Sequence, residues 1–154
     1  MGTLAKTLYE TDFVEWAAAT AELLRERRFD DVDWDHLIEE IVSLGQSDER
    51  AVRSQLRRMV MHLIKLRIQP GQAGASWRRS IVGSRNEIED LMESSPSLRR
   101  HLEENLQKVY GRAIKQVLDE TNLKSKAKEL EIPEKCPYTL DELLEGDLDT
   151  LRPK

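Results

Sequence analysis

Two of the three histidines stand three residues before a glutamate, a spacing that could serve a metal ion. The pairs are His36 with Glu39 and His101 with Glu104. Di-metal sites in helical bundles use the opposite order, Glu-x-x-His, with two further glutamates that all project inward. On a helical wheel both histidines lie more than about 130° from the apolar side of their predicted helices. We therefore expect both to point to water, and we predict no metal site and no cofactor.

The third histidine, His62, lies among large apolar side chains in LRRMVMHLIKLRIQPG, a segment without acidic residues. Its ring is about 70° from the apolar centre of its predicted helix, at the edge of the buried stripe. We predict that it is mostly buried against residues 76–80. Desolvation, helped by the charges of Lys65 and Arg67, should lower its pKa and keep the ring neutral at pH 7.

Glu40 lies near the same edge of that helix, 22 residues before His62. This separation is about 33 Å along a straight helix, so the two cannot meet within it. The expected partner of Glu40 is an arginine from another helix, such as Arg78 or Arg85. Glu40 and His62 are thus both candidates for a polar contact that is either functional or structural.

The segment ASWRRS, residues 75–80, is the strongest candidate for a binding site. Free backbone N–H groups at a helix start favour anions, and arginines beside them add charge and forked donors. The end of the preceding helix brings more cations to the same turn. The candidate anion-binding residues are Lys65, Arg67, Ser76, Arg78 and Arg79. The alternative interpretation is ordinary helix capping with solvated arginines.

No catalytic residue is predicted. Cys136 is the only cysteine, and no histidine lies near it in the sequence. A nucleophile needs a base and an orienting group, and the sequence places neither. Nucleotide-binding glycine motifs, zinc-ligand spacings and a serine elbow are all missing from the chain. The sequence favours a protein that is not an enzyme.

Hydrophobic periodicity places these residues on helices. We expect helices over residues 12–28, 35–67, 76–94 and 96–121, with a short helix after residue 139. Asp12 and Thr139 each precede a glutamate by three residues, as in a capping box. Ser76 is the expected N-cap of the third helix, and Pro96 is expected at the first position of the fourth.

The predicted fold is an all-α antiparallel bundle of four main helices in a single domain over residues 1–154. The second helix would be about 50 Å long. We therefore expect it to bend or break near Gly45, or else to project past its neighbours. A chain of 154 residues is long enough to bury a core without disulfides.

Charge is distributed unevenly along the chain. Residues 1–49 hold 13 acidic and 4 basic side chains, whereas residues 50–86 hold 9 basic and no acidic ones. The basic stretch could face an anion, a nucleic acid or an acidic protein surface. It could also neutralise the acidic first third within one fold.

Several features indicate a cytoplasmic protein. The start MGTLAKTLYE has no apolar core of a signal peptide, and no apolar run approaches the length of a membrane span. The lone cysteine fits a reducing compartment. We expect no membrane association.

Taken together, several motifs resemble a known family. They are YETDFVEWAAATAELLRERRFDDVD, LIEEIVSLGQSDER, MHLIKLRIQP, SWRRSI, SSPSL and CPYTLDELL, in that order. The chain resembles the bacterial family catalogued as domain of unknown function 29 over about residues 7–145. The resemblance implies a compact, all-helical, cytoplasmic protein of prokaryotic origin. It carries over no activity, cofactor or functional residue.

Three functions remain open. The favoured one is an interaction module that binds an unknown protein partner or a second copy of itself. The second is a small-anion-binding protein or enzyme that uses the turn around His62 and residues 76–79. The third is nucleic-acid binding through residues 50–86, ranked last because acidic segments flank this stretch.

Overall fold

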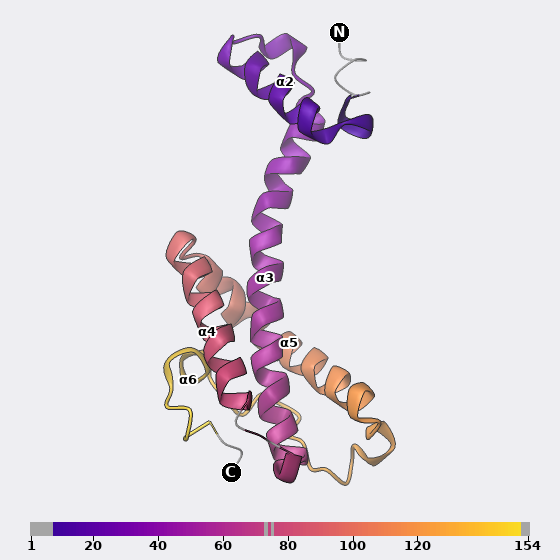
Figure 1. Cartoon of the computed structure of the whole chain (residues 1–154), viewed down its shortest axis with the longest axis vertical. Coiled ribbons are helices and arrows are strands. Elements are labelled where there is room, and N and C mark those ends of the chain that lie inside the picture. The colour runs from indigo at the N-terminus through magenta and orange to yellow at the C-terminus, as the bar shows by residue number, and fades with distance from the viewer. Residues whose placement is uncertain (1–7, 73, 75, 152–154) are drawn as a thin grey trace. The chain divides into compact units, whose positions relative to one another are not determined.

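A computed structural model describes residues 8–72, 74 and 76–151, and within them every regular element is helical (Figure 1). This result confirms the predicted all-α class, the four main helices and the short C-terminal helix. The main helices are α2 (Phe13–Arg25), α3 (Trp34–Ile68), α4 (Ser76–Ser94) and α5 (Leu98–Thr121), and the short one is α6 (Leu140–Glu145).

The chain divides into two compact units, which we call unit 1 (Met1–Ser47) and unit 2 (Asp48–Lys154). The boundary falls inside α3. Unit 1 contains α2 and the first part of α3, and unit 2 contains the rest of α3 with α4, α5 and α6. One domain over residues 1–154 stays a prediction.

The start of α2 follows its local sequence. The side chain of Asp12 accepts a hydrogen bond from the backbone N–H of Glu15 at 3.0 Å, which confirms Asp12 as the N-cap. The helix ends at Arg25, three residues before the predicted end at Arg28. Arg27 has a φ of 60°, in the left-handed region that an α-helix cannot continue.

Helix α3 is 35 residues long and continues through Gly45. Of the alternatives predicted for this helix, a break at Gly45 is therefore excluded. Glycine costs a helix interior only about 1 kcal/mol relative to alanine. The long runs of good helix formers on either side are sufficient to carry the helix through it.

The core of unit 2 is built from the apolar faces of its helices. Helices α4 and α5 flank the later part of α3, and α6 lies beside α4 (Figure 1). The fully buried side chains include Val52, Leu56, Met59 and Leu63 from α3, Ile81 and Ile88 from α4, Leu102 and Val117 from α5, and Leu143 from α6. The four α3 positions recur at the helical spacing of three or four residues, as the sequence predicts.

Two helix starts differ from prediction. Ser76 is the first residue of α4 and not its N-cap. Helix α5 begins at Leu98 with Ser97 as N-cap, so Pro96 lies in the turn before the helix. Proline fits this turn as well as the first helical position, because its fixed φ suits both.

Helix α6 is fixed at both ends. The Thr139 hydroxyl accepts from the N–H of Glu142 at 3.2 Å, which confirms the predicted cap. At the other end, Arg85 of α4 donates to the carbonyls of Leu143 at 2.7 Å and Gly146 at 2.6 Å. A guanidinium thus satisfies the free carbonyl groups at the end of the helix.

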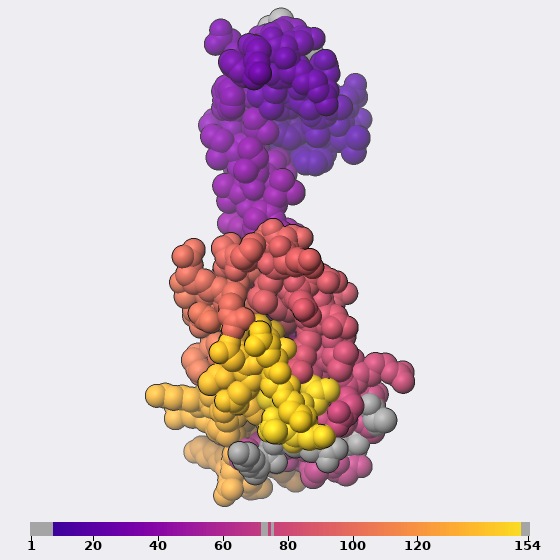
Figure 2. All heavy atoms as spheres, turned by 90° about the vertical axis from the view of Figure 1, so that its left-hand side faces the viewer, coloured from indigo at the N-terminus to yellow at the C-terminus, as the bar shows by residue number. Residues whose placement is uncertain are grey.

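The C-terminal segment lies over α4 and α5 (Figure 2). Side chains of the helices hold the segment before α6 by its backbone. The Tyr110 hydroxyl donates to the carbonyl of Pro133 at 2.5 Å, and Gln107 accepts from the N–H of Cys136 at 3.0 Å. After α6, the segment holds itself in the same way, since the Tyr138 hydroxyl donates to the carbonyl of Leu151 at 2.7 Å.

Candidate functional site

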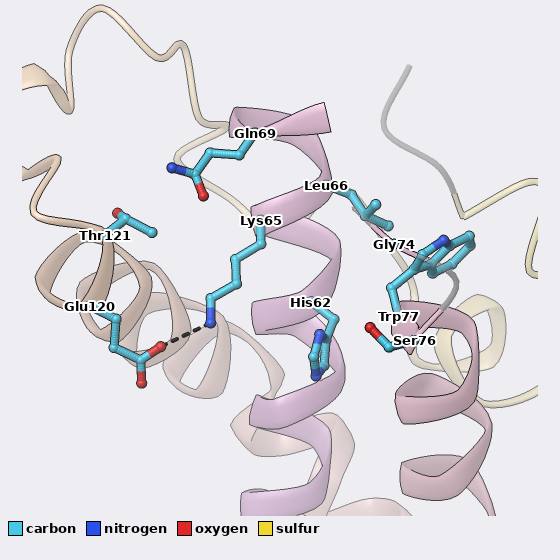
Figure 3. A pocket seen from close by; sticks show the side chains of 9 residues that line it. All are labelled: His62, Lys65, Leu66, Gln69, Gly74, Ser76, Trp77, Glu120 and Thr121. Atoms are coloured by element: carbon cyan, nitrogen blue, oxygen red, sulfur yellow. Dashed lines mark hydrogen bonds and ion pairs between the residues drawn. The ribbon is translucent and has the colours of Figure 1, made fainter. Parts of the chain in front are cut away.

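A cavity of about 560 Å³ lies beside His62, between the end of α3, the start of α4 and the end of α5 (Figure 3). We call it the His62 cavity. Lys65 and Gln69 point toward α5, whereas Leu66 points toward α4. The lining residues are His62, Lys65, Leu66, Gln69, Gly74, Ser76, Trp77, Glu120 and Thr121.

His62 lies beside the start of α4 as predicted, since Ser76 and Trp77 line the same cavity. Its side chain is only partly buried, which is less than the sequence predicts. Burial lowers the pKa of His62 below its ordinary value of 6.5, and the positive charges of Lys65 and Arg58 lower it further. The neutral ring is therefore favoured at pH 7. Arg58 takes the place that we expected for Arg67.

A carboxylate neutralises the one lysine of the cavity. The ammonium group of Lys65 is 2.9 Å from a carboxylate oxygen of Glu120, whose pKa is lowered by hydrogen bonds from Gln116 and Lys65. The cavity thus offers a neutral imidazole and a serine hydroxyl beside a closed ion pair. This arrangement can accept a proton, but it has no uncompensated cation to attract an anion.

The structure brings together only two of the five candidate anion-binding residues, Lys65 and Ser76. Arg67 donates to the carbonyl of Glu131 at 3.2 Å. Arg78 forms an ion pair with Asp149 at 2.5 Å and lies over the ring of its neighbour Trp77, 5.5 Å from its centroid. Arg79 is exposed.

Glu40 belongs to a polar cluster in unit 1. It accepts a hydrogen bond from the Tyr9 hydroxyl at 2.6 Å, so the expected arginine partner is wrong. The Tyr9 ring stacks on His36 with centroids 3.9 Å apart, and His36 Nδ1 is 2.5 Å from Asp33. Tyr9 comes from a helical stretch, residues 8–11, before α2, and its partners come from the start of α3 or just before it.

The prediction that His36 and His101 point to water is also wrong. Their side chains are only 25% and 18% exposed. Nε2 of His101 accepts from the guanidinium of Arg53 at 2.8 Å, because arginine can only donate. The described residues contain no group of three or more acidic, cysteine or histidine side chains placed to hold a metal ion.

Sequence reasoning missed a second hollow, of about 440 Å³, between α3 and α5. We call it the basic groove. The signal was in the spacing: the α3 arginines recur after three and four residues, and the α5 cations after four, so each set lies on one helix face. The lining residues are Arg50, Arg53, Ser54, Arg57, Asn105, Lys108, Val109 and Arg112.

Comparison with known proteins gives a family but no activity. The family model described as "Domain of unknown function DUF29" matches residues 8–148. The chain belongs to this family. No curated protein and no solved structure matches the chain. The DUF29 match covers both units, and so the polar cluster of unit 1 and both hollows of unit 2 lie within the family's extent.

None of the helices in the described part of this DUF29 protein combines the length and apolarity that crossing a membrane requires.

Proposed function

We propose that this DUF29 protein is a cytoplasmic interaction module that associates with a second copy of itself. The contact is an apolar strip on the first part of α3, which we call the α3 stripe. The single observation that carries the proposal is the exposure of this strip. Its members are Trp34, 46% exposed, Ile38, 55%, Ile41, 59%, and Val42, 52%.

Exposed apolar side chains are concentrated in unit 1. Nine large hydrophobic residues are exposed in the described part of the chain, and eight of them lie in residues 13–44. Contiguous exposed apolar surface marks interaction sites in soluble proteins, whereas single exposed apolar residues are ordinary. Such a concentration supports a contact surface in unit 1.

The α3 stripe has the pattern of a helix-packing surface. Trp34, Ile38 and Ile41 follow the spacing of three and four residues that the buried side chains of the same helix follow in unit 2. A Cβ atom placed on Gly45 would meet nothing within 4 Å, so another helix can approach closely at this point. The stripe therefore fits a helix of similar pattern.

Charge favours a second copy of α3 in the antiparallel direction. The first turns of α3 carry carboxylates, including Asp35 and Glu39, and Arg50 begins its basic stretch. If two copies cross near Gly45, Glu39 of one lies opposite Arg50 of the other. A twofold axis repeats this pairing, so the dimer contains the Glu39–Arg50 pair twice, and the same apolar strip of each chain forms the contact.

Sedimentation of the full chain tests the proposal. We expect a dimer at concentrations from about 1 to 100 μM, which correspond to association free energies of about −8 to −5.5 kcal/mol. The variant Ile38→Glu/Ile41→Glu should be a monomer with unchanged helix content. A matched control is Val82→Glu on α4, an exposed apolar residue in unit 2, which should leave the dimer intact.

A wild-type chain that stays monomeric over this range would overturn self-association. Equal loss of the dimer in the stripe variant and in Val82→Glu would show that the α3 stripe is not the contact.

A further inference from the structure

The basic groove of unit 2 concentrates positive charge without neutralising it. Five of the eight lining residues are cationic and none is acidic. None of the five forms an ion pair with a carboxylate in the described part of the chain. Elsewhere in unit 2, Lys65, Arg78 and Arg99 each pair with an acidic side chain.

Like charges repel one another, so an uncompensated cluster destabilises the folded chain unless an anion joins it. The groove keeps this cluster on two rigid helices. Arg50, Arg53 and Arg57 come from α3, and Lys108 and Arg112 come from α5. Groups on helices hold their positions better than groups on loops.

A histidine orients one of the cations, and two neutral polar side chains also line the groove. His101 accepts from Nη1 of Arg53 at 2.8 Å, which fixes one edge of that guanidinium and leaves its other donors available. The amide of Asn105 donates to the carbonyl of His101 at 2.7 Å. The hydroxyl of Ser54, which is exposed, adds a neutral donor at the rim.

We propose that the basic groove binds an oligophosphate, an anion with two or more linked phosphate groups. Forked guanidinium donors match phosphate oxygens in pairs, and several cations in one hollow match a ligand with several charges. The volume of 440 Å³ lies in the range of about 300–1,000 Å³ typical of small-molecule sites.

The lining also limits what is recognised. It contains no aromatic ring, so a nucleobase would have no surface on which to stack. The groove therefore recognises phosphate groups and not the base of a nucleotide. Nucleic-acid backbones carry the same phosphate chemistry, and the test has to distinguish the two sources.

Calorimetric titration of the full chain with sodium tripolyphosphate at low salt tests the site. The groove variant Arg57→Gln/Arg112→Gln should weaken binding by about tenfold or more, since it removes two charged donors. The control Arg58→Gln/Lys115→Gln makes the same charge change on exposed positions of the same two helices, outside the groove. It should change the affinity by about twofold or less.

A second variant shows whether weaker binding comes from the lost donors or from misfolding of the chain. Arg57→Lys/Arg112→Lys keeps both charges and loses only the forked donors, so it should fold and bind with intermediate affinity. No heat of binding for the wild type at about 1 mM tripolyphosphate would overturn the proposal. Equal losses in the groove and control variants would do the same, because they would show a diffuse charge effect.

A single-stranded oligonucleotide of mixed sequence is the second arm. We expect it to bind more weakly than tripolyphosphate. If it binds more tightly and displaces tripolyphosphate, the groove is a nucleic-acid contact and the oligophosphate assignment is wrong. The groove and control variants leave Arg50, the residue that the proposed dimer contact shares with the groove, unchanged. Sedimentation of the same variants reports self-association separately from binding.

Discussion

In unit 2 the apolar side chains of α3 are buried, as Leu56 at 0% exposure shows, whereas in unit 1 Ile38 and Ile41 on the same helix are more than half exposed. Both regions follow the same hydrophobic spacing. The difference is that α4 and α5 cover the later part of α3. Helical spacing predicts which side of a helix is apolar, but it does not predict whether anything covers that side.

The largest expected effect is the loss of stability when a buried leucine of α3 in unit 2 is truncated, compared with an exposed leucine of α3 in unit 1. Leu56→Ala should lower the free energy of unfolding by about 2–5 kcal/mol, because it leaves a cavity in the core of unit 2. Leu44→Ala, at a position 70% exposed on the same helix, should stay within about 0.5 kcal/mol. Urea unfolding followed by circular dichroism measures both, and similar losses would mean that the Leu44 side chain is buried in the folded protein.

Arg85 gives the next largest effect. Arg85→Ala removes three hydrogen bonds to the end of α6, and it should cost about 1–3 kcal/mol because partly buried carbonyls lose their donor. Arg79→Ala on the same helix is the control and should be nearly neutral. Thermal unfolding of the two variants compares them directly, and equal melting temperatures would contradict the capping role.

Two tyrosines sharpen the comparison between units. A hydrogen bond to Glu40 raises the pKa of Tyr9 to about 12, whereas burial raises the pKa of Tyr110 to about 12. Glu40→Gln should therefore move only Tyr9 back toward its ordinary value of 10.0. Ultraviolet titration of the phenolate band reports this change, with Tyr9→Phe to assign it.

The same shifts predict how stability depends on pH. A phenol whose pKa is raised by folding stabilises the folded state below the unfolded pKa near 10, and this contribution is lost as the pH rises toward 12. Stability should fall over this window, less steeply in Tyr110→Phe. A flat profile between pH 10 and 12 would show that these phenols ionise normally in the folded chain.

The smallest effect concerns His62. Its pKa is lowered by burial, so an NMR titration should place its midpoint below the ordinary 6.5. Burial of the neutral ring is compatible with full stability above the ordinary pKa of 6.5. Stability is then lost as the pH falls from 6.5 toward the lower pKa of the folded state. Lys65→Gln should raise the midpoint. A wild-type midpoint at or above 6.5 would mean that solvent reaches the ring freely.

Local signals in the sequence predicted local structure well. Asp12 and Thr139 were identifiable as caps, because a capping box involves only neighbouring residues. The long α3 and the position of His62 beside Ser76 followed from periodicity and a short connection. Pro96 was misplaced by two residues, since a proline suits the turn before a helix as well as its first position.

Contacts between distant segments could not be predicted in this way. His101 was assigned to water from its own helix alone, yet Arg53 of another helix reaches it. The partner of Glu40 proved to be Tyr9, a neutral donor, where a search by charge considers only arginine and lysine. The basic groove needs both α3 and α5, so the spacing within each helix shows two charged faces but not that they meet.

The way in which the C-terminal segment is held has a consequence for how this family can diverge. The Tyr110 hydroxyl donates a hydrogen bond to the carbonyl of residue 133, and Arg85 donates to carbonyls at the end of α6. The Tyr138 hydroxyl donates to the carbonyl of residue 151. Every residue type supplies such a carbonyl. These hydrogen bonds therefore place no requirement on the side chain of the residue that accepts, whereas the donating residues cannot change without releasing the segment. Packing in the core still constrains the buried Leu143 and Leu151.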